Sequence, residues 1–142
     1  MYKHILMPLD NSSADEVILK HVRALARFCS ADLVLVHVSD GYVARFQDEL
    51  DLEDSEEMKE DRLYLENRKK ELFQDGFKVK AYLTGGEPAD QILSIAEKEN
   101  CDLIAMSTHG HRFLKDFILG SVAENIRHRT NIPILMIRAK GH

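Results

Sequence analysis

The sequence predicts a single-domain α/β protein in which five parallel strands form one open sheet with helices on both faces. Two observations predict this class. Short, nearly continuous apolar runs alternate with segments of helical periodicity along the chain, and such alternation implies parallel strands joined by right-handed crossovers. The length of 142 residues suits one domain, and no linker or internal repeat divides it. We therefore expect one domain over residues 1–142.

The bulk composition narrows the classes of function. With 44% hydrophobic and 30% charged residues, the chain is typical of globular proteins and unlike collagen, low-complexity or disulfide-scaffold sequences. The net charge of −5 gives no general attraction to nucleic acid phosphates. The N-terminal apolar run is too short for a signal sequence, and no stretch approaches the ~20 apolar residues of a membrane span. We expect a cytoplasmic protein without nucleic acid or membrane partners, and with Cys29 and Cys101 as free thiols.

Residues 4–9 and 33–38 are apolar at nearly every position and predict the first two strands. Between them, Ser13 and Glu16 have the spacing of a capping box, so we expect the first helix to begin there and to end near Ser30. Its expected buried face comprises Val17, Ile18, Val22, Leu25 and Phe28.

The second half of the chain predicts three more strands. Nine carboxylates between Asp48 and Asp61 indicate a solvated crossover, followed by a helix that Gly76 ends, with an apolar side through Leu63, Leu65, Leu72 and Phe73. Strands are expected at residues 78–83, 103–106 and 134–137. Pro88 predicts a helix start after the turn at residues 85–88, and the buried side of that helix is expected at Ile92, Leu93, Ile95 and Ala96. We expect a loop over residues 108–120 and a helix from Ser121 to about Arg129.

Open parallel sheets bind ligands beyond the carboxyl ends of their strands, where the strand order reverses. Among these strand ends, the segment after the fourth strand has the residues best suited to bind an anion. It reads Ser107-Thr-His-Gly110, nine further residues, and then Gly120-Ser121 at the expected helix start. Glycines let an anion approach the backbone, and the first turn of a helix offers unpaired N–H groups. Gly110, Gly120, Ser121 and Val122 could together surround a di- or triphosphate. The alternative is that the glycines make turns and Ser121 caps a helix.

This segment, written Ser107-x2-Gly110-x9-Gly120-Ser121, resembles the Gly-x2-Gly-x9-Gly-Ser/Thr motif of nucleotide-binding members of the universal stress protein family. The likeness extends to residues 5–10, His37-Val38, residues 86–88, and residues 102–106, 119–124 and 132–138. The resemblance implies a Rossmann-like, adenine-nucleotide alpha-hydrolase-like sheet of strand order 3-2-1-4-5, usually in a homodimer. It also implies ATP (or AMP/ADP) as ligand, with or without Mg²⁺.

Carried over by position, the resemblance implies that Leu9 and Asp10, after Pro8, lie near the adenine and ribose and that Val38 presents backbone groups to the base. Asp10 has an equal alternative as a strand-end turn former. Met106 and Ser107 would flank the ribose. Ser107 replaces the family's first glycine: its hydroxyl suits a sugar oxygen, but a positive φ there would be strained. The implied binding set is Pro8, Leu9, Asp10, Val38, Met106, Ser107, Gly110, His111, Gly120, Ser121, Val122 and Ala123.

We expect a regulatory or stress-response ATP-binding protein and not an enzyme. Two alternatives stay open: a slow ATP hydrolase in which Asp10 and Mg²⁺ position water, and a ligand-free dimeric interaction module. The apolar run at residues 134–137 is expected to pair two copies at a sheet edge. His109 and His111 lack the further ligands of a zinc site, and His37 is expected to be a buried, hydrogen-bonded histidine.

Overall fold

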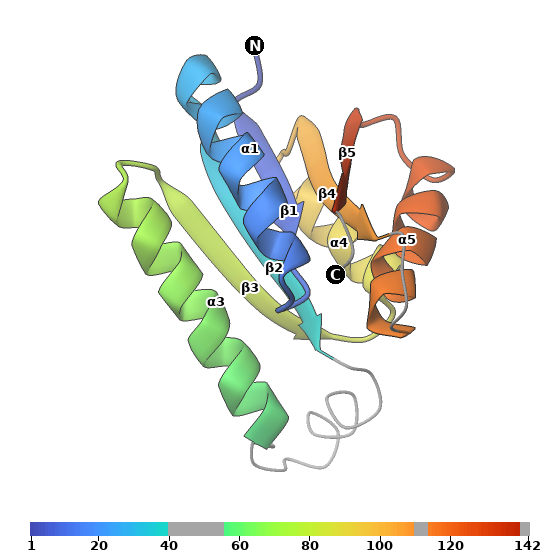
Figure 1. Ribbon diagram of the computed structural model, residues 1–142. Coiled ribbons are helices and arrows are strands. Elements are labelled where there is room, and N and C mark those ends of the chain that lie inside the picture. Colours follow the sequence, from blue (N-terminus) through green and yellow to red (C-terminus); the bar gives the residue numbers. More distant parts are fainter. Residues whose placement is uncertain (40–55, 110–113, 140–142) are drawn as a thin grey trace.

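The computed structural model describes residues 1–39, 56–109 and 114–139, with only the backbone described for Glu57, His109 and residues 114–120. These residues form five strands and four helices in one sheet of strand order β3-β2-β1-β4-β5, in which every pair of neighbours is parallel (Figure 1). The predicted fold class and strand order are thereby confirmed. The elements are β1 (His4–Pro8), α1 (Ala14–Cys29), β2 (Asp32–Ser39), α3 (Glu56–Gln74), β3 (Val79–Gly85), α4 (Pro88–Lys98), β4 (Leu103–His109), α5 (Leu114–Arg127) and β5 (Ile134–Ala139).

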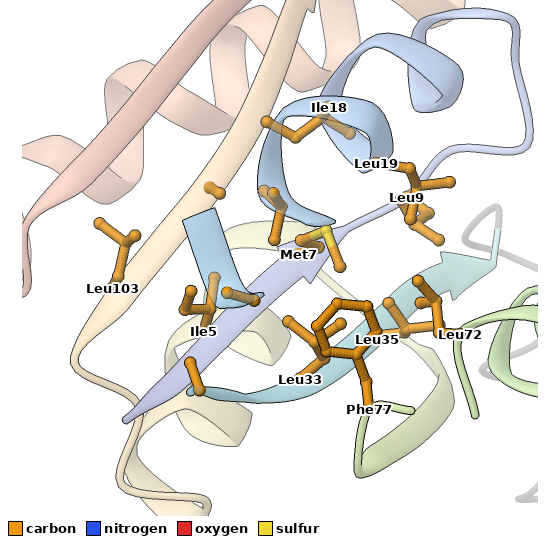
Figure 2. Packing of buried hydrophobic residues seen from close by; sticks show 14 of the residues in the cluster. Ile5, Met7, Leu9, Ile18, Leu19, Leu33, Leu35, Leu72, Phe77 and Leu103 are labelled. Carbon is orange, nitrogen blue, oxygen red and sulfur yellow. The ribbon is translucent and has the colours of Figure 1, made fainter. Parts of the chain in front are cut away.

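Two apolar layers sandwich the sheet. On one face, α1 and α3 pack on alternate strand residues such as Ile5, Met7 and Leu35 (Figure 2). On the other face, α4 and α5 pack on the intervening residues, including Leu6 and Val36. Each central strand thus buries both of its faces, which is why its sequence is apolar without alternation.

Apart from β1, which ends at Pro8 rather than Leu9, the strands extend further toward their carboxyl ends than the apolar runs indicate. β4 continues three residues past Met106 because β5 stays paired with it, with Ser107 opposite Ile137 and His109 opposite Ala139. Likewise β3 reaches Gly85, opposite Ser39 of β2. Backbone pairing, which does not require apolar side chains, therefore lengthens the site-bearing edge of the sheet.

Two predicted helix faces are partly wrong. In α1, Ile18 and Val22 are buried as predicted, whereas Val17 is exposed and Phe28 is 89% exposed. Leu19, which was not predicted, belongs to the buried stripe. In α3, Leu65 and Leu72 are buried as predicted, whereas Leu63 and Phe73 are exposed. In both helices the exposed residues lie off the stripe that a period of 3.6 residues directs at the sheet. In α4 the prediction holds: Ile92, Ile95 and Ala96 are buried, and Leu93 is partly buried.

Helix starts also differ from prediction. Ser13 precedes α1 but makes no capping hydrogen bond through its side chain, so the predicted capping box is wrong. Ser12 takes that role, since its Oγ accepts from the backbone N–H of Ala14 at 3.3 Å. The end of α1 at Ser30 is confirmed, with Ser30 in the left-handed region. Pro88 begins α4 as expected, and the Glu87 carboxylate accepts from the amides of Ala89 and Asp90.

The start of α5 differs most from the prediction, and it changes the expected phosphate-binding segment. This helix begins at Leu114, so Gly120 and Ser121 lie in its interior rather than at its first turn, and it ends at Arg127 rather than Arg129. The six residues before Gly120 include leucine, lysine and isoleucine, and a glycine within a helix costs only about 1 kcal/mol. Helix propagation through Gly120 is therefore physically reasonable.

Three smaller predictions concern cysteines, acidic residues and membranes. Cys29 and Cys101 are both free, as expected, and burial raises the pKa of the Cys101 thiol to about 12. Asp61, the last residue of the acidic run, is buried rather than solvated; residues 48–55 of that run lie outside the described residues. No helix within the described residues is both long enough and apolar enough to cross a bilayer.

Candidate functional site

The strand order reverses between β1 and β4. From β1 the chain proceeds outward to β2 and β3 on one side, and later to β4 and β5 on the other. The described β1–β4 ladder comprises Ile5 opposite Leu103 and Leu6 opposite Ile104, whereas β1 stays in register with β2 as far as Pro8. The carboxyl ends of β1 and β4 therefore flank the topological switch point, which is the usual ligand position in such sheets.

The residues predicted to approach a base and ribose converge at this edge. Pro8 and Leu9 are buried, and the amide of Leu9 donates to the carbonyl oxygen of Val36 at 2.8 Å. Val38 lies two residues further along β2 and is half-buried. Asp10 comes directly after Leu9 at the end of β1. Its carboxylate accepts a hydrogen bond from the Ser12 hydroxyl, so Asp10 does form a strand-end turn.

Met106 and Ser107 lie on the other side of the switch point, in β4, and both are fully buried. Within the described residues, positive φ outside glycine occurs at Asn11, Ser30 and Asn100, so Ser107 has ordinary strand geometry and bears no strain from replacing glycine. Its Oγ is buried without a hydrogen-bond partner in the described part of the chain. A buried hydroxyl in that state is costly, and an acceptor that reached it would recover the cost.

The predicted phosphate side is not assembled as expected. Val122 and Ala123 are buried in the apolar layer under α5, and Ser121 is exposed on the same helix. Since α5 starts at Leu114, the amides of residues 120–123 fall within the helix and not among its unpaired first N–H groups. Gly110 and His111 lie outside the described residues.

A buried polar cluster beside Asp10 was missed at the sequence level. We use "β1–α1 turn" for residues 10–13. Asp15, fully buried on α1, accepts hydrogen bonds from the backbone amides of Asp10 at 3.1 Å and Asn11 at 2.9 Å. The Tyr64 hydroxyl of α3 donates to the same carboxylate. The signal in the sequence was that Asp15, a carboxylate, lies on the same helix face as the apolar residues Ile18, Leu19 and Val22.

Opposing influences act on the Asp15 carboxyl. Burial and the neighbouring Asp10 charge raise its pKa from 3.8 to about 7, while the hydrogen bonds from Tyr64 and the two amides lower it. Burial, followed by the charge of Asp15, raises the pKa of Tyr64 far above its ordinary value. The Tyr64 hydroxyl therefore stays protonated and acts as a donor, and Asp15 titrates near neutrality.

A second buried contact joins the same region. His37 of β2 is buried as predicted, and its Nδ1 lies 2.7 Å from the carbonyl oxygen of Leu9. A carbonyl can only accept, so Nδ1 donates, and Nε2 faces the Asp61 carboxylate of α3 at 3.1 Å. The other Asp61 oxygen accepts from the Asn11 side-chain amide at 3.3 Å. Two residues of α3 thus contact the β1–α1 region. Among the described residues, no cluster of histidine, cysteine and carboxylate side chains fits a metal ion.

The family model described as "Universal stress protein family" matches residues 1–138. The chain belongs to the universal stress protein family.

Two curated universal stress proteins illustrate the likeness. Universal stress protein MJ0577 of Methanocaldococcus jannaschii is 38% identical over 161 residues, covering 99% of this chain and 98% of its own length. Universal stress protein YxiE of Bacillus subtilis is 28% identical over 97% of this chain and 100% of its own length.

Solved universal stress protein structures share the fold. The MJ0577 structure matches with a TM-score of 0.80 and 40% identity over 100% of this chain and 99% of its own. An Archaeoglobus fulgidus universal stress protein in complex with dAMP matches with a TM-score of 0.70 and 20% identity, over 96% of this chain and 98% of its own. A universal stress protein in complex with cAMP has a TM-score of 0.66, 16% identity and 96% coverage of both chains. At these two identities the likeness shows the fold alone.

Proposed function

We propose that this universal stress protein binds an adenine nucleotide, with ATP as the expected form, at the carboxyl ends of β1, β2 and β4. The observation that supports this best is the buried Ser107 hydroxyl, which has no hydrogen-bond partner within the described residues and lies on β4, across the switch point from the end of β1. The dAMP and cAMP complexes of two universal stress proteins of the same fold add support for an adenine ligand.

The geometry of the strands supports the base and ribose side of the proposed site. Asp10 sits where an acceptor could meet ribose hydroxyls, next to the buried backbone of Leu9. Val38 lies on β2 beyond Val36, whose carbonyl oxygen accepts from the Leu9 amide. Met106 and Ser107 bound the opposite wall, and the Ser107 hydroxyl would donate to a sugar oxygen once the groups that cover it move aside.

The phosphate side rests on the motif and not on the described geometry. The proposed phosphate neighbours remain Gly110, His111 and residues 120–123. The backbone amides of residues 120–123, however, lie within α5 and not among its unpaired first N–H groups. Affinities for adenosine, AMP and ATP separate the two sides. If phosphates are bound as proposed, affinity rises along this series; if only the base and ribose are held, all three bind alike.

Isothermal titration of the folded protein with ATP, and with GTP as a base control, tests the proposal. We expect saturable ATP binding that Asp10→Ala weakens at least tenfold, which corresponds to about 1.4 kcal/mol. Asp32→Ala is the matched control, because Asp32 is a half-buried aspartate at the amino end of β2, away from the site. Equal ATP affinities in the two variants would contradict the assignment of Asp10.

Within this proposal the nucleotide is a regulatory ligand, bound in the cytoplasm and not turned over. Chromatography of ATP after long incubation with the protein checks this, and conversion to ADP that Asp10→Ala abolishes would instead favour the slow hydrolase.

Dimerisation through β5 belongs to the same proposal. β5 is an edge strand, and its apolar residue Met136 is 46% exposed. Exposed apolar edge strands usually need covering. Sedimentation equilibrium should show a dimer at micromolar concentration, and a monomer at all concentrations would contradict it.

A further inference from the structure

The β1–α1 turn has a backbone conformation that needs support. Asn11 has a φ of 61°, in the left-handed region that residues other than glycine seldom adopt. The backbone amides of Asp10 and Asn11, one on each side of the Asp10 Cα, both donate to one acceptor, the Asp15 carboxylate. Asp15 thereby fixes the direction of the backbone that bears Asp10, the residue proposed to meet the ribose.

Asp15 is itself held from α3. The Tyr64 hydroxyl donates to Asp15 Oδ2, the oxygen that also accepts from the Asn11 amide. The Arg68 guanidinium lies over the Tyr64 ring at 5.2 Å from its centroid and pairs with Glu16 of α1. The Arg68–Glu16 pair thus links α3 to α1 beside the Tyr64 ring, and the Tyr64 hydroxyl points at the buried Asp15 carboxylate.

A second contact from α3 reaches the same turn. Asp61, one helical turn before Tyr64, accepts from the Asn11 side chain and faces His37. The His37 ring in turn donates to the carbonyl oxygen of Leu9, the residue before Asp10. Contacts from α3 thus reach both sides of Asp10.

We propose that Asp15 and Tyr64 are positioning residues, which hold the β1–α1 turn in its ligand-binding conformation and make nucleotide affinity depend on α3 and on pH. This inference rests on the proposed function, since it assigns a role to residues that do not themselves touch the ligand.

The charge on Asp15 decides how many hydrogen bonds its carboxyl group can accept. An ionised carboxylate accepts from both amides and from Tyr64, whereas a protonated one must direct its own hydrogen at a neighbour and loses one of these bonds. The charged or titratable groups that face it are Asp10 from the turn and Tyr64 from α3. Behind them lie the Arg68–Glu16 pair and the Asp61–His37 pair. With a pKa of about 7, the carboxyl changes state near neutral pH.

The test compares Tyr64→Phe with Tyr82→Phe. Both variants delete one hydroxyl that donates to a carboxylate, but the Tyr82 partner is Glu99, beyond the end of α4 on the other face of the sheet. The ATP dissociation constant is measured for each variant and for the wild type by titration calorimetry. We expect Tyr64→Phe to weaken binding about fivefold, as if the competent turn were populated one-fifth as often, and Tyr82→Phe to leave it unchanged.

The pH profile distinguishes positioning from mere structural support. The ratio of the Asp15→Asn to the wild-type dissociation constant is measured from pH 6 to pH 8, so that protonation of ATP itself cancels. We expect the ratio to be largest at pH 8 and to approach one at pH 6, where wild-type Asp15 is mostly protonated and resembles asparagine. Amide chemical shifts of Asp10 and Asn11 in the free protein should follow the same titration.

The outcomes separate this inference from the function on which it rests. Saturable ATP binding with equal affinity in Tyr64→Phe and Tyr82→Phe overturns the inference alone. A loss of affinity in Asp15→Asn that is constant with pH reduces Asp15 to a structural role and also overturns it. The absence of any binding by the folded wild-type protein overturns the proposed function, and this inference with it.

Discussion

Replacing Asp15 with asparagine separates what its carboxylate does for folding from what it does for the ligand. The pKa of Asp15 is raised to about 7 in the folded protein, from the ordinary value of 3.8 that applies to the unfolded chain. Between these two values the folded protein keeps a proton that the unfolded chain has released. Stability from this proton is complete below about pH 4 and is lost as the pH rises to about 7. The loss is roughly 4 kcal/mol, from about 1.36 kcal/mol for each pKa unit.

Asparagine cannot ionise, and it resembles the protonated aspartic acid in size and polarity. We therefore expect the free energy of unfolding of Asp15→Asn to equal that of the wild type near pH 4 and to exceed it by up to roughly 4 kcal/mol above pH 7. The same variant should bind ATP more weakly at pH 8. Ionised Asp15 would then be an example of a functional residue that lowers stability.

Urea unfolding followed by circular dichroism, from about pH 4.5 to pH 8, measures the difference between the two proteins at each pH. Asp32→Asn is the control: its side chain is 44% exposed, and we expect a difference of less than about 0.5 kcal/mol that does not change with pH. A wild type that gained stability over Asp15→Asn as the pH rose would refute the reasoning. It would mean that the three hydrogen bonds to Asp15 outweigh burial and the charge of Asp10.

Three further predictions concern stability. Asp61→Ala should destabilise the fold by about 1–3 kcal/mol in urea, because it removes the buried carboxylate that His37 Nε2 and the Asn11 side-chain amide contact; a loss below about 0.5 kcal/mol would contradict these contacts. Gly120→Ala should stabilise α5 by about 1 kcal/mol, since Gly120 lies in the helix interior, and a destabilised variant would contradict that placement. Leu72→Ala should cost about 2–5 kcal/mol, whereas Phe73→Ala, 70% exposed, should cost less than about 1 kcal/mol; equal losses would contradict the assigned face of α3.

The parts of the fold that were predictable depend on local pattern. The continuous apolar runs of the central strands, such as residues 33–38, result directly from burial on both faces. Helix ends with a backbone requirement, such as Pro88 and the left-handed Ser30, were also readable. The start of α5 was not, because a Gly-Ser pair after a strand is compatible both with a helix start and with a helix interior.

The candidate site was predictable only in part for a different reason. Residues at strand ends, such as Asp10 and Ser107, are placed by topology once the strand order is known. The contacts of Asp15 and Asp61 depend on where α3 packs, and Tyr64 is separated from Asp15 by 49 positions along the chain. Local rules instead favoured the Ser13–Glu16 capping box, which the structure lacks because Asp15 and Ser12 satisfy the same turn.

Nuclear magnetic resonance mapping tests most directly whether the carboxyl ends of β1, β2 and β4 bind an adenine nucleotide. On addition of ATP to isotope-labelled protein, we predict saturable shifts at the amides of Asp10, Val38 and Ser107. Lys3 and Asn100, at the amino ends of the strands, should keep their positions. An unchanged spectrum at saturating ATP, or shifts confined to the amino ends, would contradict the proposed site.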